Sequence, residues 1–267
     1  MDTTLLMVDR RTRTDRRQMG ETPLARELGQ AIAASEIELV LQPQFSCEDD
    51  RLVGAEALVR WSHPDEGLLA GDALFEIAMQ SGLARQLSAH VRSKAMQAAA
   101  DWPEHLRLSL NVTADDLADS SFADSIASAM AESGLAPDRL TLEITEQALV
   151  DEVEYSAKVL QGLAEAGIWI ALDDFGAGFC NFQYLKILPL HYLKLDRTMV
   201  DGIVEDKRDF AVLRGIVAMA HALDLAVIAE GIETDEQRAL VAAEGCAAYQ
   251  GFLKAKPMGV GEFAELV

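Results

Sequence analysis

Acidic and amide side chains recur along the chain at the ends of short apolar runs, where β-strands are expected to end. A single strand-end acid is well explained as a helix cap or a salt-bridge partner. A whole series is not, because buried strands favour apolar residues and an unpaired buried carboxylate is costly. We therefore interpret the series as one site, made of Glu56, Asn111, Glu143, Asp173, Asp174, Lys194, Asp196, Glu230 and Gln250.

Bound cations would neutralise such a cluster, because Lys194 and Arg60 supply too little positive charge. The ligand atoms are nearly all hard oxygens, which select Mg²⁺ or Mn²⁺ over Zn²⁺ or copper. The adjacent acids Asp173 and Asp174 suit two metal ions about 4 Å apart, and such pairs of ions hydrolyse phosphate esters by in-line attack. Ca²⁺ fits the same ligands with longer and looser bonds, so we expect it to inhibit.

Short apolar runs alternate with segments of helical periodicity, which predicts a mainly parallel sheet. Eight strands are expected in one domain, which suggests a closed barrel of the α/β class whose strands end on one common face. The expected strands span residues 37–45, 52–61, 106–113, 139–145, 168–174, 192–196, 225–230 and 247–250.

The first two expected strands are an exception, because only about six residues, 46–51, join them. That connection is too short for a helical crossover, so the two strands should run antiparallel. Further along the chain, Thr234 and Gln237 have the spacing of a capping box, which predicts the start of a helix.

The chain has 267 residues, and 50% of them are hydrophobic, which is enough for a sizeable core. Its formal net charge of −21 argues against duplex nucleic acid as a partner, since that needs a basic surface. Residues 1–24 carry five arginines and four acids, and we interpret them as a flexible tail before one domain at 25–267. A cytoplasmic location is expected, because the sequence has no bilayer-spanning run, no secretory signal and no CxxC motif.

Several short motifs contain the residues named above. They are Gln42-Pro43, Glu56-Ala57-Leu58 with Arg60-Trp61, Asn111, Glu143-x-Thr145-Glu146, DDFGAG at 173–178, Lys194-Leu195-Asp196, AEGIET at 229–234 and Gln250-Gly251. Each motif alone is a weak signal, but the ordered set is specific. It resembles the signature series of the EAL-domain cyclic-di-GMP phosphodiesterases over roughly residues 25–267.

The resemblance implies a modified TIM (βα)8 barrel with one antiparallel strand near the N-terminus. It also implies that two Mg²⁺ or Mn²⁺ ions support hydrolysis of one phosphodiester bond of cyclic di-GMP, which gives linear pGpG. Asp173 would bridge the two ions. The metal ligands implied by the motifs are Glu56, Asn111, Glu143, Asp173, Asp174 and Glu230.

The remaining roles also follow from the resemblance. Lys194 would orient the attacking water and stabilise charge, and Glu230 has been viewed as the base. Glu233 would join Lys194 and Glu230 as a catalytic residue, and Gln250 would help to bind the substrate and complete the site.

The resemblance implies three further contacts around the metal site. Gln42 and Arg60 would hold the substrate, and Glu146 would anchor the DDFG loop, which we define as residues 173–184. This loop departs from the family pattern at Ala177, Cys180 and Asn181. We expect these departures to affect regulation and the coupling between the subunits of a dimer more than the chemistry.

A homodimer through the DDFG loop is expected from the family and from the aromatic residues Phe175, Phe179, Phe182 and Tyr184, which otherwise fill the rim of the barrel. No sensor domain fits before the barrel, so regulation would come from a protein partner, from dimerisation or from expression level. Two alternatives stay open. One is a non-catalytic cyclic-di-GMP receptor or protein-interaction module on the same fold, and the other is a different Mg²⁺-dependent barrel enzyme, for example one that acts on a sugar phosphate.

Overall fold

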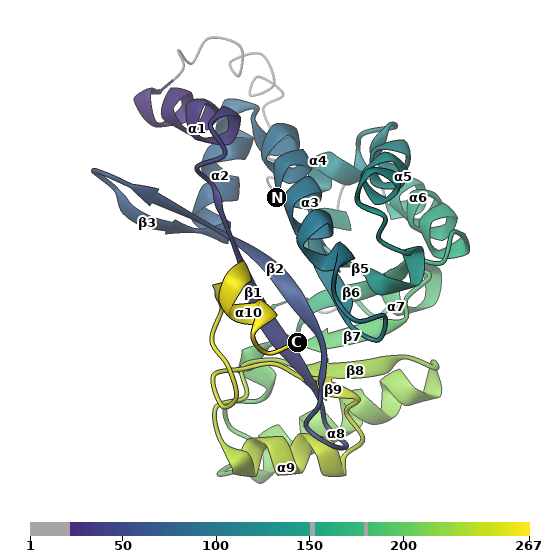
Figure 1. The fold of residues 1–267 in the computed structure, drawn as a ribbon. Coiled ribbons are helices and arrows are strands. Elements are labelled where there is room, and N and C mark those ends of the chain that lie inside the picture. The colour runs from purple at the N-terminus through teal and green to yellow at the C-terminus, as the bar shows by residue number, and fades with distance from the viewer. Residues whose placement is uncertain (1–21, 150–152, 179–180) are drawn as a thin grey trace, which may run out of the picture.

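Eight strands form a closed barrel in the computed structural model, which describes residues 22–149, 153–178 and 181–267 (Figure 1). Around the barrel the strands follow the order β1, β9, β8, β7, β6, β5, β4, β2, and the pairing of β1 with β2 closes it. The barrel strands are β1 (Glu38–Ser46), β2 (Leu52–His63), β4 (Arg107–Val112), β5 (Leu140–Thr145), β6 (Trp169–Phe175), β7 (Tyr192–Leu195), β8 (Ala226–Ala229) and β9 (Ala248–Tyr249).

The barrel confirms the expected α/β class and all eight expected strands, whose ends differ from the expected ends by at most two residues. The antiparallel start of the sheet is also confirmed. Strand β1 runs antiparallel to β2, with Gln42 opposite Glu56, and antiparallel to β9 on its other side. The remaining barrel strands pair in parallel, so their carboxyl ends meet on one face of the barrel.

Helices cover the outside of the barrel (Figure 1). Between the helices and the strands, the outward side chains of the strands form the main core. Leu108, Leu142, Ile170, Leu193 and Val227 are fully buried there. From residue 84 onward, the described α-helices are α3 (Ala84–Ala100), α4 (Ala114–Leu117), α5 (Phe122–Ser133), α6 (Val153–Glu165), α7 (Tyr184–Ile187), α8 (Lys207–Ala222), α9 (Asp235–Ala243) and α10 (Val260–Ala264). Short 3₁₀ turns, η3 (Pro137–Arg139), η4 (Glu146–Leu149) and η5 (Arg197–Met199), lie between the strands and helices.

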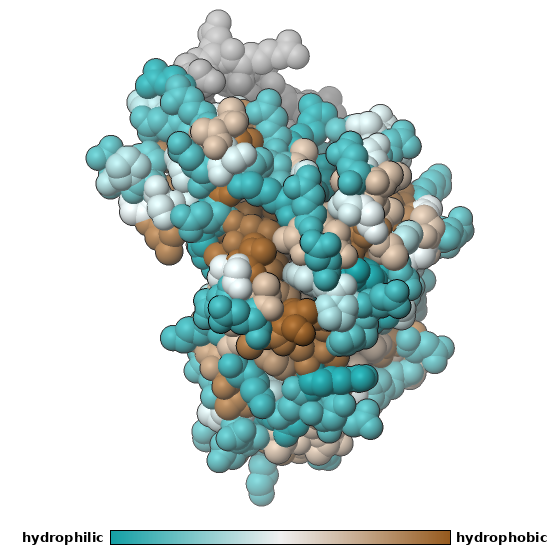
Figure 2. Space-filling model, viewed as in Figure 1, coloured by the Kyte–Doolittle hydropathy of each residue, from teal (hydrophilic) through white to brown (hydrophobic). Residues whose placement is uncertain are grey.

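The predicted capping box is confirmed at the start of α9. The Thr234 side chain accepts a hydrogen bond from the Gln237 backbone, and the Gln237 side chain accepts one from the Thr234 backbone. Among the described residues, no helix is both long enough and apolar enough to cross a membrane. Figure 2 shows hydrophilic side chains over most of the viewed face, with apolar side chains gathered near its middle.

A second, smaller core lies beside the barrel and was not expected from the sequence. It joins α1 (Pro23–Ala33), α2 (Gly71–Ser81) and the part of β2 that continues past the barrel to pair with β3 (Gly67–Ala70). The cap of α1 is Thr22, so the helix begins two residues before the expected domain boundary. A last short strand, β10 (Met258–Gly259), pairs with β1.

Candidate active site

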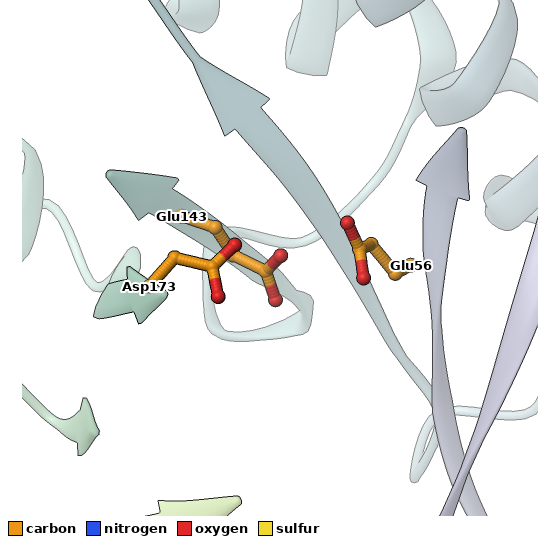
Figure 3. Close-up of side chains that lie close together, drawn as sticks. All are labelled: Glu56, Glu143 and Asp173. Carbon is orange, nitrogen blue, oxygen red and sulfur yellow. The ribbon is translucent and has the colours of Figure 1, made fainter. Parts of the chain in front are cut away.

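Carboxylates from the ends of different strands converge inside the barrel. Figure 3 shows Glu56 of β2, Glu143 of β5 and Asp173 of β6 with their carboxylates directed toward one another. One oxygen from each lies within 4.8 Å of the others, and the same holds for a second group made of Asp173, Asp174 and Glu230. Asp173 belongs to both groups of oxygens.

Lys194 of β7 lies in the middle of this cluster, and its side chain is fully buried. Its Nζ is 2.6 Å from Glu143 Oε2, 2.7 Å from Glu230 Oε1 and 3.0 Å from Asp173 Oδ1. Among the described residues, no other cation contacts these carboxylates. One ammonium therefore faces several buried acids, which leaves the cluster short of positive charge.

The pKa values of the acids reflect this shortage. Burial and the neighbouring carboxylates raise the pKa of Glu143 well above its usual range and raise that of Glu230 to about 8. Burial and Asp173 raise the pKa of the more exposed Asp174 to about 6. Burial raises the pKa of Asp173 as well. These acids give up their protons readily only when more positive charge is present.

Glu56 differs from the other buried acids. Burial alone would raise its pKa, but Lys194 and hydrogen bonds from Gln250 and Asn111 lower it below its usual range. Asn111 Nδ2 donates to Glu56 Oε1 at 2.8 Å, and Gln250 Nε2 donates to Glu56 Oε2 at 2.8 Å. Gln250 also donates to Glu230 Oε1 at 3.2 Å, so it connects the two sides of the cluster.

One oxygen of Glu143 lacks any partner in the described part of the protein. Glu143 Oε1 is buried and accepts no hydrogen bond, whereas Oε2 of the same carboxylate faces Lys194. A buried acceptor without a donor is unfavourable unless something else satisfies it. A divalent cation bound by oxygens fits this position, and the neighbouring oxygen ligands suit Mg²⁺ or Mn²⁺.

Gln42 and Arg60 lie on the β1–β2 ribbon, outside the hydrogen-bonded cluster. Gln42 is directly opposite Glu56, so their side chains share a face, and Arg60 lies four residues further along the same face of β2. Both residues are half-buried, and Arg60 Nη1 donates to the Val59 carbonyl at 2.7 Å. They are placed at the edge of the site rather than among the acids.

Glu146 lies at the start of η4, three residues after Glu143, and contacts the DDFG loop. Its carboxylate accepts from the backbone N–H of Asn181, at 3.2 Å for Oε1 and 3.0 Å for Oε2. Burial raises the pKa of Glu146, although the Asn181 N–H acts in the opposite direction. Phe179 and Cys180 of the same loop lie outside the described residues.

Two acids that were expected at the site, Glu233 and Asp196, make their contacts outside the cluster. Glu233 was expected to take part in catalysis, but its side chain is 42% exposed and pairs with Arg197 at 3.1 Å. The chain turns at Gly231, which has φ of +68°, so Glu230 faces the barrel while Glu233 lies beyond the turn. Asp196 accepts a hydrogen bond from the Thr198 backbone at 2.9 Å and caps η5.

Gln44 is a buried neighbour of the site that the sequence analysis missed. It is 4% exposed, and its Nε2 donates to Gln250 Oε1 at 3.0 Å. The sequence did contain a signal for Gln44. Residues two apart on a strand point to the same face, and Gln44 lies two residues after Gln42.

Comparison with known proteins points to one family. The sequence is 35% identical over 251 residues to the cyclic di-GMP phosphodiesterase NbdA of Pseudomonas aeruginosa, which covers 92% of this chain and 32% of NbdA. It is 33% identical over 243 residues to the bifunctional diguanylate cyclase/cyclic di-GMP phosphodiesterase MucR of the same organism, covering 88% of this chain and 35% of MucR. The chain therefore spans about a third of the length of these curated relatives.

Solved structures share the fold over most of the chain. The PaMucR phosphodiesterase in complex with c-di-GMP matches with a TM-score of 0.84 and 32% identity, over 91% of this chain and 100% of that one. The EAL enzyme Bd1971, bound to cAMP and cyclic-di-GMP, matches with a TM-score of 0.85 and 29% identity, over 91% of this chain and 68% of that one. The EAL domain family model matches residues 25–257, and the chain therefore belongs to the EAL domain family.

Proposed function

We propose that the chain is a metal-dependent phosphodiesterase that hydrolyses one phosphodiester bond of cyclic di-GMP and releases linear pGpG. The observation that carries the proposal is the pair of carboxylate groups that share Asp173 and surround Lys194. The substrate is supported by the relatives and the solved structure described above, which are named for cyclic di-GMP.

Two divalent cations, Mg²⁺ or Mn²⁺, would be held by the two groups of ligands. Glu56, Asn111, Glu143 and Asp173 would hold one ion, and Asp173, Asp174 and Glu230 the other. Glu143 Oε1 has no partner among the described residues, and the pKa of Glu143 is raised; both observations support this assignment, because both mark a lack of positive charge. When bound, such a pair of ions activates a water molecule and stabilises the charge that develops on the phosphate.

The residues around the ions would orient the reacting groups. Lys194 is held by Glu143 and Asp173, so its ammonium stays fixed where it can orient the attacking water and stabilise negative charge on the phosphate. Glu230 would accept the proton of that water, because its Oε1 lies in the cluster, 2.7 Å from Lys194 Nζ. Gln250 would keep the carboxylates of Glu56 and Glu230 in place by donating to both.

Gln42 and Arg60 would bind the substrate at the edge of the site. A guanidinium offers several N–H donors in a fixed plane, which suits a phosphate or the edge of a guanine base. The position of Arg60 on the same face of β2 as Glu56 would bring such a contact next to the reacting phosphodiester.

A homodimer through the DDFG loop and a regulatory protein partner are further parts of the proposal. Phe175 and Tyr184 of the loop are buried and fill the core, whereas Phe182 is 54% exposed. Ile187, in the helix that follows the loop, is 40% exposed. These exposed apolar side chains would form a self-complementary two-fold contact.

The purified chain should be incubated with cyclic di-GMP in the presence of Mg²⁺, Mn²⁺, Ca²⁺ or a chelator, with products separated by liquid chromatography. Formation of pGpG with Mg²⁺ or Mn²⁺, and none with chelator, is expected. Binding of cyclic di-GMP without turnover in any cation would favour a non-catalytic receptor instead. Turnover of a sugar phosphate without turnover of cyclic di-GMP would favour a different barrel enzyme.

A further inference from the structure

We infer that Gln44 is a positioning residue that fixes the amide orientation of Gln250 and, through it, the geometry of the carboxylate cluster. The expected effect of Gln44 on turnover rests on the proposed function. Its expected effect on metal binding does not depend on which substrate the site takes. Gln44 touches none of the carboxylates in the described structure and would act only through Gln250.

The orientation of Gln250 follows from the chemistry of its neighbours. Its Nε2 lies 2.8 Å from Glu56 Oε2 and 3.2 Å from Glu230 Oε1. Glu56 already accepts from two other donors, since Asn111 Nδ2 lies 2.8 Å from its Oε1 and Lys194 Nζ lies 3.5 Å from its Oε2. The amide NH₂ of Gln250 must therefore face the acids, and its carbonyl oxygen must face the other way.

Gln44 supplies the donor that this carbonyl oxygen requires. Gln44 Nε2 lies 3.0 Å from Gln250 Oε1, and the two residues are 4% and 3% exposed. A buried carbonyl without a donor is unfavourable, so the contact favours one of the two flipped states of the Gln250 amide. With Gln44 in place, both N–H groups of Gln250 remain available to Glu56 and Glu230.

The surroundings of Gln44 leave its side chain free to be replaced. It lies opposite Gly54 in β2, and it borders a cavity of about 410 Å³ that is also lined by Ser109, Thr141 and Ile228. Tight packing therefore does not hold Gln44, and a side chain of similar size fits the same space. The hydrogen bond to Gln250 is the specific contact that the position provides.

Two substitutions separate the donor from the shape of the side chain. Gln44→Glu keeps the shape but places an acceptor against Gln250 Oε1, so the Gln250 amide would flip and its oxygen would face Glu56 and Glu230. Gln44→Leu removes the donor without adding charge. Loss of a residue that orients metal ligands typically costs about 10- to 100-fold in metal affinity or activity, and we expect the larger loss for Gln44→Glu.

The test measures Mn²⁺ affinity by titration calorimetry and the kcat and KM for cyclic di-GMP. For Gln44→Glu we expect the Kd for Mn²⁺ to rise at least ~10-fold and kcat to fall, with little change in KM. Gln80→Glu is the matched control, because Gln80 is an exposed glutamine whose Nε2 also donates to a side-chain oxygen, that of Glu76, outside the site. Its Mn²⁺ affinity should equal that of the wild type.

A double-mutant cycle shows whether Gln44 acts through Gln250. Gln44→Leu should weaken Mn²⁺ binding in the wild type but change it less than about two-fold in a Gln250→Leu background. Equal losses in both backgrounds, or wild-type Mn²⁺ affinity in Gln44→Glu, would overturn the inference. If Gln44→Glu does not fold, the Gln44→Leu cycle decides alone. A wild type that binds Mn²⁺ but does not turn over cyclic di-GMP would refute the proposed function and leave the Mn²⁺ test of Gln44 valid.

Discussion

Lys194 Nζ lies 2.6 Å from one oxygen of Glu143, while the other oxygen of the same carboxylate is buried without a hydrogen-bond partner among the described residues. The fully buried lysine thus satisfies half of the carboxylate, and nothing else in this part of the protein satisfies the other half. The cluster holds together without metal, but at a cost that a bound cation would remove.

Glu143→Gln should stabilise the metal-free protein and abolish both Mn²⁺ binding and turnover. Burial and the neighbouring carboxylates raise the pKa of Glu143 well above its usual range, so burying its charge without metal opposes folding. A neutral amide avoids that step, and we expect the free energy of unfolding in chelator to rise by roughly 1–3 kcal/mol. Urea unfolding measures it, with the exposed Glu165→Gln as the control. Lower metal-free stability together with normal turnover would contradict the prediction.

The stability of the metal-free protein should fall as pH rises, with Glu230 as one cause. In the folded protein the pKa of Glu230 is raised from its ordinary value of 4.5 to about 8, because the side chain is buried beside other carboxylates. The folded state therefore holds this proton more tightly, so the contribution is fully present below the unfolded pKa and lost as pH rises toward 8. The slope for one such group is at most about 1.4 kcal/mol per pH unit.

Urea unfolding in chelator between pH 5 and pH 8 tests this slope. Glu230→Gln should unfold with a shallower pH dependence than the wild type. Saturating Mn²⁺ should reverse the trend in the wild type, because metal ligands bind in their deprotonated form. A wild type and a variant with equal slopes in chelator would show that Glu230 titrates normally.

The place of most site acids could be predicted because parallel strands in a barrel end on one face. Three of these acids lie within otherwise apolar runs, namely Glu56, Glu143 and Glu230. Their carboxylates therefore had to face the interior of the barrel or a ligand. Glu233 and Asp196 also come after strands, but Glu233 pairs with Arg197 and Asp196 caps η5. The direction of a side chain after a strand depends on the turn that follows, such as the left-handed Gly231, which the apolar pattern of the strand does not contain.

The sequence also could not predict how the pKa values of neighbouring acids differ. Glu56 and Glu143 are both buried beside Lys194, yet the pKa of Glu56 is lowered and that of Glu143 is raised. The difference arises from hydrogen bonds, since Asn111 and Gln250 both donate to Glu56. Such contacts depend on side-chain placement within the barrel. The small core around α1, α2 and β3 was missed for a related reason, because β3 has only four residues and gains its stability from pairing with β2.

Turnover should require Mg²⁺ or Mn²⁺ and should be inhibited by Ca²⁺. The candidate ligands are oxygens, which bind Ca²⁺ as well, but Ca²⁺ takes longer bonds and a looser geometry than in-line attack demands. Initial rates at fixed Mg²⁺ should fall as Ca²⁺ is added and recover when more Mg²⁺ is supplied. Undiminished turnover in excess chelator would rule out a metal-dependent reaction.

Phe182→Glu should weaken self-association of the chain. Phe182 is 54% exposed in the DDFG loop and contacts the core residue Phe175 edge to face, so a charge there would mainly oppose an apolar two-fold contact. Light scattering at micromolar concentrations should show a dimer for the wild type and a lower mass for the variant. Leu68→Glu is the control, because Leu68 is 65% exposed on β3, away from this loop. A strictly monomeric wild type with full activity would refute the dimer as a requirement.

Glu146→Ala should lower turnover strongly while changing stability little. Both oxygens of Glu146 accept from the backbone N–H of Asn181, and the same loop begins with Asp173 and Asp174. Loss of this contact would leave the loop less well placed, and loss of positioning can reduce a rate by ~10²-fold. A higher Mg²⁺ concentration should restore part of the rate, because cation binding would again fix Asp173 and Asp174.

The alternative role for Glu146 is a favourable interaction with the N-terminal end of a helical turn, worth ~0.3–1 kcal/mol. The two roles predict different results for Glu146→Ala. As a helix-end acid, Glu146 would contribute to the unfolding free energy and not to turnover. As a loop anchor, it would change the Mg²⁺ dependence of the rate and leave unfolding in urea nearly unchanged. Wild-type turnover of the variant at low Mg²⁺ would show that the contact with Asn181 does not position the loop.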